Sequence, residues 1–115
     1  MDACLFCRIV AGEIPATVVY ESDQLLAFRD INPKAPVHVL VVTKAHHDDV
    51  AALAEADPEL AVALLAGTTA AARAEGIADG GYRVIFNVGP DSGQEVAHVH
   101  AHVLGGSRMG PKLAA

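Results

Sequence analysis

The chain has 115 residues, of which 52% are hydrophobic, and its formal net charge is −6 at pH 7. This length suits one domain with its own core, so residues 1–115 are expected to fold as a single domain. The negative charge argues against nucleic acid as a partner. No apolar run approaches the ~18 residues of a membrane span and no signal peptide pattern is present, so a cytoplasmic location is expected.

Two cysteines stand three positions apart near the N-terminus, at Cys4 and Cys7. In a reducing compartment this spacing indicates a metal site or a redox pair more than a structural disulfide. Two small buried thiols without any chemistry are the alternative. Residues 8–11 then predict a short helix that stops at Gly12.

Three strands are predicted in the first half of the chain. Residues 18–21 and 24–30 form an antiparallel pair around a Ser22-Asp23 turn. Residues 37–42 are nearly all β-branched, which favours a central, buried strand. His38 lies inside that strand, and it is either a functional residue or a core histidine bonded to a backbone carbonyl.

A long helix is predicted after the polar segment 43–49, which itself leads into helix. Asp57 suits the N-cap and Pro58 the first turn, and the helix is expected to run to residue 74 or 75 before Gly76. One narrow face of small residues suits close packing, either within the subunit or between two subunits. That face comprises Leu60, Leu64, Gly67, Ala71 and Ala74.

The last third predicts a strand over residues 82–88, a glycine-containing loop over 89–95 and a closing strand over 96–104. Residues 107–115 are expected to form a loose or partner-dependent tail. This order of elements predicts an α+β fold, with about five antiparallel strands, one long helix and one or two short helices.

Three histidines alternate in the closing strand, at positions 98, 100 and 102. Alternation places them on one face of the strand, while the residues between them face the core. At ~3.3 Å per residue, His98 and His102 are about 13 Å apart along the strand, too far to share one metal ion. The three histidines are therefore expected to have different roles.

Histidine serves as a nucleophile and as an acid or base near neutral pH. Beside a glycine-containing loop, whose backbone N–H groups suit phosphate oxygens, the row indicates phosphorus chemistry. In that interpretation His100, at the centre of the row, attacks phosphorus and a neighbouring histidine protonates the leaving group. The spacing by itself leaves metal binding and an inert polar sheet face open as alternatives.

The run from His98 to Leu104 resembles the signature of the histidine triad (HIT) superfamily. Gly105-Gly106, Gly93-Gln94-x-Val96 and Asn87-x-Gly89 are similar to motifs of its Hint branch. The likeness extends back through Phe28-x-Asp30-Ile31-x-Pro33-x-Ala35-Pro36-x-His38 to Ile14-Pro15 and Phe6, and so covers nearly the whole chain.

This resemblance implies a HIT-like fold and a hydrolase of purine nucleoside monophosphate derivatives, in particular phosphoramidates, of the adenosine 5'-monophosphoramidase type. It implies that His100 is the nucleophile and forms a nucleotidyl-histidine, that His102 contacts the phosphate and protonates the leaving group, and that His38 supports them. A dinucleoside polyphosphate hydrolase, or a nucleotide-binding or interaction protein with incidental hydrolysis, is the alternative. No organic cofactor is implied.

The resemblance also implies a nucleotide site. Asp30 would bind the ribose, while Phe6, Phe28, Ile31 and Leu40 would form the base slot. Asn87 and the backbone of Gly93, Gln94, Glu95 and Val96 would hold the α-phosphate. Some relatives have serine at the position of Glu95; a carboxylate there repels phosphate, so we expect Glu95 to point away or to contact the leaving group.

Bacterial members of the superfamily with an N-terminal C-x-x-C resemble this chain, and they carry a structural zinc ion. The matching ligands here are Cys4, Cys7, His46 and His98, a set suited to tetrahedral zinc. His47 is a rival for His46, and reduced, metal-free cysteines are the alternative. The resemblance further implies a homodimer, joined edge to edge or across the long helix.

Overall fold

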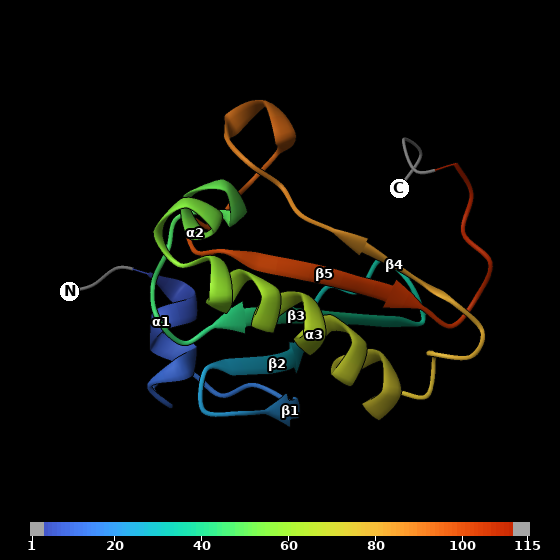
Figure 1. Cartoon of the computed structure of the whole chain (residues 1–115). Helices are drawn as coiled ribbons and strands as arrows, with labels where there is room; N and C mark the ends of the chain where they lie inside the picture. Colours follow the sequence, from blue (N-terminus) through green and yellow to red (C-terminus); the bar gives the residue numbers. More distant parts are fainter. Residues whose placement is uncertain (1–3, 112–115) are drawn as a thin grey trace.

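The structure is a computed structural model and describes residues 4–111 (Figure 1). It confirms the predicted fold class, because five antiparallel strands form one sheet in the order β1-β2-β3-β5-β4. Within residues 4–111, no helix has both the length and the apolar character needed to cross a membrane. The elements in chain order are α1 (Leu5–Val10), β1 (Val18–Glu21), β2 (Leu25–Arg29), β3 (Val37–Thr43), α2 (Val50–Ala56), α3 (Pro58–Ala74), β4 (Tyr82–Ile85), the 3-10 helix η1 (Pro90–Ser92) and β5 (His100–Gly105).

Helix α3 packs across one face of the sheet, as Figure 1 shows. It begins as predicted, since the Asp57 carboxylate accepts from the backbone N–H of Leu60 at 3.1 Å. A methyl group at Gly67 would lie 2.5 Å from Cδ1 of Leu25, so the helix approaches β2 closely only because this residue has no side chain. The small-residue face therefore packs within the subunit, although Ala74 in the last turn is exposed.

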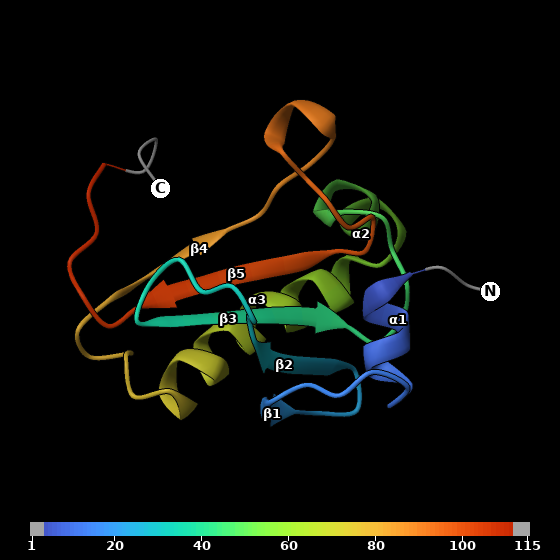
Figure 2. The same cartoon turned by 180° about the vertical axis from the view of Figure 1, so that it is seen from behind.

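The opposite face of the sheet is seen in Figure 2, with α1 packed against one end of it. Its apolar side chains form a second, smaller core made by Phe6, Leu26, Phe28, Leu40 and Val42. Because side chains alternate along a strand, the residues between them on β2 and β3 point to α3 instead. His100 and His102 of β5 lie opposite Val42 and Leu40 of β3, on the face without α3.

Three boundaries differ from the sequence prediction by more than one residue. Helix α1 begins at Leu5 rather than at residue 8, because Cys4 is its N-cap and its Sγ accepts from the Cys7 N–H at 3.3 Å. Strand β4 ends at Ile85 rather than at residue 88. Strand β5 begins at His100 rather than at residue 96, since the Val99 N–H donates to the carbonyl of His47 at 2.7 Å instead of to a neighbouring strand.

The predicted tail lies only partly within the described residues, since positions 112–115 fall outside them. In the described part, Nη2 of Arg83 donates to the carbonyl of Gly110 at 2.7 Å. Residues 107–111 thus have a contact to β4, while their relation to a second subunit stays a prediction.

Candidate active site

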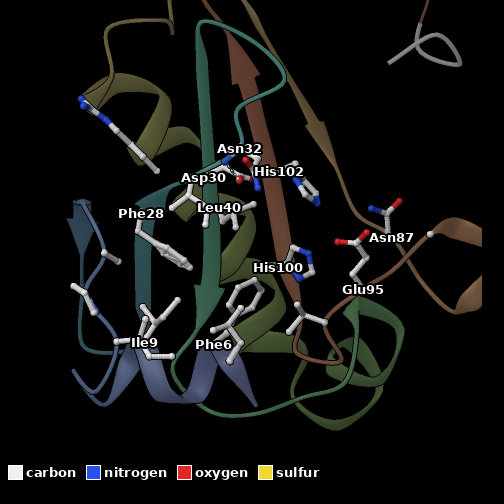
Figure 3. A pocket seen from close by; sticks show the side chains of 18 residues that line it. Phe6, Ile9, Phe28, Asp30, Asn32, Leu40, Asn87, Glu95, His100 and His102 are labelled. Carbon is white, nitrogen blue, oxygen red and sulfur yellow. Dashed lines mark hydrogen bonds between the residues drawn. The ribbon is translucent and has the colours of Figure 1, made fainter. Parts of the chain in front are cut away.

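A hollow of about 470 Å³ lies on the sheet face that carries His100 and His102 (Figure 3). This volume is within the range of small-molecule sites. The hollow collects segments that are far apart in sequence, because α1, β2, β3, β5 and three loops meet there. Most residues predicted from the sequence line it, namely Phe6, Phe28, Asp30, Ile31, Leu40, Asn87, Gly93, Glu95, Val96, His100 and His102.

One end of the hollow is apolar. The ring of Phe6 meets Phe28 edge-on, with centroids 5.6 Å apart, and it meets the His100 ring at 4.9 Å. Ile9, which the sequence analysis did not select, lines the same end from α1. Ile9 follows Phe6 by three residues, so the two side chains lie on one face of a helix. The sequence analysis missed this because it placed the start of the helix at residue 8 rather than at Leu5. This end suits a flat apolar group.

The hydrogen bond of His100 defines where its proton lies. Nδ1 of His100 is 2.8 Å from the backbone carbonyl of His98. A carbonyl only accepts, so Nδ1 carries the proton and Nε2 of the neutral ring keeps a free lone pair. His100 is buried at the base of the hollow. Its ring is therefore held in the form that suits nucleophilic attack.

His102 is held in the opposite tautomer by a chain of two hydrogen bonds. The backbone N–H of Lys34 donates to Nδ1 of His38 at 3.0 Å, so the His38 proton is on Nε2. That Nε2 lies 2.9 Å from Nδ1 of His102 and donates to it. The remaining proton of His102 is therefore on its own Nε2. The lone pair of His100 and the N–H of His102 belong to rings whose centroids are 5.0 Å apart.

The rings of His102 and His38 are uncharged at neutral pH. Burial lowers the pKa of His102 from its ordinary value of 6.5 to about 4, and the neighbouring His100 and His38 act in the same direction. Burial also lowers the pKa of His38, against an opposite effect of the Asp30 carboxylate. The 3.5 Å contact between His38 and Asp30 is thus not an ion pair at neutral pH. His38 is not bonded to a backbone carbonyl, because its two ring nitrogens bond the Lys34 N–H and His102.

Asp30 stands at the rim where β2 ends. Its Oδ1 accepts from the backbone N–H of Asn32 at 2.8 Å, which closes the turn. Ligand atoms of Asp30, His38 and His102 lie within 4.8 Å of one another. The hydrogen bonds described above account for this grouping without a metal ion, since each ring nitrogen of His38 already has a partner.

The polar end of the hollow is formed by the loop between β4 and β5, where Asn87, Gly93 and Glu95 line it. Gln94 is not among the lining residues. Its side chain accepts from the Gly89 N–H at 2.9 Å and donates to the carbonyls of Asp48 and Val96 at 2.8 and 3.0 Å. Gln94 therefore holds the loop together rather than facing the hollow.

A second cluster joins both cysteines to two histidines, and it contains all four predicted metal ligands: Cys4, Cys7, His46 and His98. The Sγ atoms of Cys4 and Cys7 lie 3.3 and 3.5 Å from Nδ1 of His98, and Sγ of Cys7 lies 3.3 Å from Nδ1 of His46. Tetrahedral zinc bonded at about 2.3 Å to sulfur and 2.0–2.1 Å to nitrogen separates its ligand atoms by about 3.5 Å. These residues fit such an ion.

The surroundings of the cluster orient its histidines. Nε2 of His98 donates to the carbonyl of Thr43 at 2.7 Å, which leaves the lone pair of Nδ1 on the side of the sulfur atoms. Nε2 of His46 faces a carboxylate oxygen of Asp48 at 3.2 Å. Burial, with Cys4 acting in the same direction, raises the pKa of the Cys7 thiol, and a bound cation would offset this by favouring the thiolate.

The arrangement separates the three histidines of the row. His98 belongs to the cysteine cluster, whereas His100 and His102 line the hollow. The two sites touch, because Phe6 lies between the cysteines in sequence and its ring is 5.9 Å from that of His98. His47 is not in the cluster; its carbonyl accepts from Val99.

The chain is similar in sequence and fold to known proteins. Residues 11–109 match the family described as HIT domain. The chain is 39% identical to the purine nucleoside phosphoramidase of Escherichia coli K12, over 98% of this chain and 95% of that protein. It is 46% identical to the 14 kDa zinc-binding protein of Zea mays, over 91% and 83%. A HIT family hydrolase from Clostridium thermocellum has a TM-score of 0.92 and 42% identity, with 98% of each chain covered.

Proposed function

Because the chain belongs to the HIT domain family and is similar to a hydrolase structure over nearly its whole length, we propose that it is a purine nucleoside phosphoramidate hydrolase. The observation that carries the proposal is the pair of opposite tautomers: the free lone pair on Nε2 of His100 and the proton on Nε2 of His102. One ring is prepared to attack and the other to donate a proton.

The reaction proceeds in two displacements. Nε2 of His100 attacks phosphorus and the P–N bond breaks, while the leaving nitrogen takes the Nε2 proton of His102 and departs as the amine. The negative charge left on the deprotonated His102 is balanced by the positive charge of the nucleotidyl-His100 beside it. Water then attacks the phosphorus of the nucleotidyl-histidine, giving a proton to His102 and releasing AMP from His100. Protons and electron pairs balance, since His102 loses one proton in the first step and regains one in the second.

The apolar end of the hollow supports binding of a purine base between the rings and aliphatic side chains of Phe6, Ile9, Phe28, Ile31 and Leu40. Asp30 lies at the rim between that end and the histidines, where its carboxylate would accept from the ribose hydroxyl groups. Asn87 and the backbone around Gly93 line the polar end, where they would donate to the phosphate oxygens.

The cysteine cluster is proposed to bind structural zinc. When bound, the ion would hold α1 against the start of β5 and take no part in the reaction. The cluster supports this proposal through its donor set and spacing, and the name of the maize relative agrees with it. Reduced thiols in such a site suit a cytoplasmic location, which we include in the proposal.

A homodimer is also proposed. Two features support it: β4 is an edge strand of the sheet, and α3 exposes Val62 and Leu65 on the side away from the core. Light scattering at micromolar concentration is expected to give twice the mass of the chain. A monomer at that concentration would contradict the dimer.

The function is tested with adenosine 5'-phosphoramidate. His100→Ala is expected to abolish release of AMP, measured by chromatography, while calorimetry still detects binding of AMP. His47→Ala is the matched control, because His47 lies outside both the hollow and the cysteine cluster. Full turnover by His100→Ala would exclude His100 as the nucleophile.

Two other functions are separated by the same assays. A dinucleoside polyphosphate hydrolase would turn over diadenosine polyphosphates faster than the phosphoramidate. A nucleotide-binding or interaction protein would bind AMP tightly and hydrolyse both substrates far too slowly for useful turnover. The acidic net charge of −6 and the carboxylate of Glu95 in the hollow favour the phosphoramidate over a polyphosphate.

A further inference from the structure

The carboxylate of Glu95 has no partner in the part of the chain that the structure describes. It forms no hydrogen bond and no ion pair with residues 4–111. Figure 3 shows it pointing into the hollow, toward the space between His100 and Asn87. Of the two positions expected for this residue, the structure therefore excludes the one that points away.

No lysine or arginine within residues 4–111 neutralises Glu95 from the lining of the hollow. Arg29 is the basic residue of that lining, and its guanidinium donates to both carboxylate oxygens of Glu75 at 2.9 Å. It lies beside Asp30 at the other end. The negative charge of Glu95 thus acts on whatever group occupies the polar end.

A second hollow, of about 410 Å³, shares Leu5, Glu95 and Val96 with the first. Asp48 also lines this second hollow, where one of its carboxylate oxygens lies 3.2 Å from Nε2 of His46, so the second hollow contains a second carboxylate besides Glu95. In Figure 3, Glu95 and Asn87 lie on the other side of His100 from Phe28 and Ile9 of the apolar base slot. With the nucleoside in that slot and His100 attacking from the base of the hollow, the leaving group projects toward the mouth that Glu95 borders.

We propose that Glu95 is a specificity-determining residue that selects phosphoramidates whose leaving amine carries a second, positively charged group. This inference rests on the proposed function and names its substrate class. A diamine or a basic amino acid side chain provides such a group, with one nitrogen bonded to phosphorus and an ammonium reaching Glu95 and, in a longer amine, Asp48. The same carboxylate disfavours anionic leaving groups, among them nucleoside polyphosphates.

The test uses three AMP amidates of equal chain length. Their amines are 1,4-diaminobutane, butylamine and 4-aminobutyrate, which end in an ammonium, a methyl group and a carboxylate. The measured quantity is the ratio of kcat/KM values between these substrates, for the natural chain and for Glu95→Gln and Glu95→Ser. Asp91→Asn is the matched control, because Asp91 is an exposed acid of the same loop outside both hollows.

The natural chain is expected to prefer the ammonium amidate over the methyl amidate by about tenfold, as for one charge pair near a protein surface. Both Glu95 variants should bring this ratio close to one, whereas Asp91→Asn keeps it. Added salt should reduce the preference of the natural chain, since the pair is partly exposed. The carboxylate amidate should be the poorest substrate of the natural chain and gain most from the substitutions.

Two failures are distinguishable. If the natural chain hydrolyses all three amidates, and Glu95→Gln leaves their kcat/KM ratios unchanged, the role of Glu95 is refuted while the proposed function stands. If the natural chain hydrolyses none of them, the proposed function is refuted, and the inference with it. His100→Ala run in parallel shows that any hydrolysis observed belongs to this site.

Discussion

Replacing His38 tests whether its hydrogen bond prepares His102 as the proton donor. In His38→Leu the ring that donates to Nδ1 of His102 at 2.9 Å is gone, and the apolar side chain still fills the buried position. Nothing then holds the proton of His102 on Nε2. His38→Gln is the matched variant, because its amide N–H reaches the region of the lost ring N–H.

The expected loss follows from the role of a general acid, which contributes about 10²–10⁴ in rate. In His38→Leu the His102 ring is still present but free to change tautomer, so the loss in rate should lie at the lower end of that range. We expect kcat for the phosphoramidate to fall about a hundredfold in His38→Leu, or about 2.7 kcal/mol of activation free energy, and less than about tenfold in His38→Gln. Stability should fall by about 1–3 kcal/mol, because Nδ1 of His102 loses its donor.

The assay compares two leaving groups. Adenosine 5'-phosphoramidate needs a proton on its departing nitrogen, whereas the 4-nitrophenyl ester of AMP releases a stable anion without one. His38→Leu should therefore be slow on the amidate and close to the natural chain on the ester. If both substrates slow equally, His38 has a structural role only, and if neither slows, the hydrogen-bond chain from Lys34 has no part in the reaction.

Three further outcomes are expected. Cys7→Ser should contain no zinc when measured by atomic absorption, whereas a metal content equal to that of the natural chain would contradict the site. At a zinc concentration a hundredfold above the dissociation constant, the variant should also be less stable by about 2.7 kcal/mol. The pKa of His102 is about 4 in the folded chain and 6.5 in the unfolded chain, so the free energy of unfolding should decrease as the pH falls from 6.5 toward 4. This decrease should be about 2 kcal/mol after allowance for partial exposure. Urea unfolding of His102→Asn over the same pH range should show a smaller decrease. Gly67→Val should cost about 2 kcal/mol in the same assay because its side chain would collide with Leu25, while Val at the exposed Ala66 should cost under about 0.5 kcal/mol.

Much of the site was visible in the sequence because it depends on local periodicity. The alternation along β5 places His100 and His102 on one face and their neighbours in the core, and the structure agrees. The predicted metal ligands and most of the predicted nucleotide-binding residues came from resemblance to a family, not from spacing. The structure brings those sets together in two places, and His46 rather than His47 lies in the cysteine cluster.

The sequence by itself determined the order of the elements, the bounds of α3 and the two faces of the strands, since caps, turns and side-chain alternation are local properties of the chain. Strand order and register are not local. Only the tertiary structure decided that β3 pairs with β5 so that His38 meets His102, that the Lys34 N–H sets their tautomers, and that His98 leaves the strand for the cysteines. The tertiary structure also decided that the Glu95 side chain points into the hollow, because its direction depends on how the loop between β4 and β5 lies over the sheet.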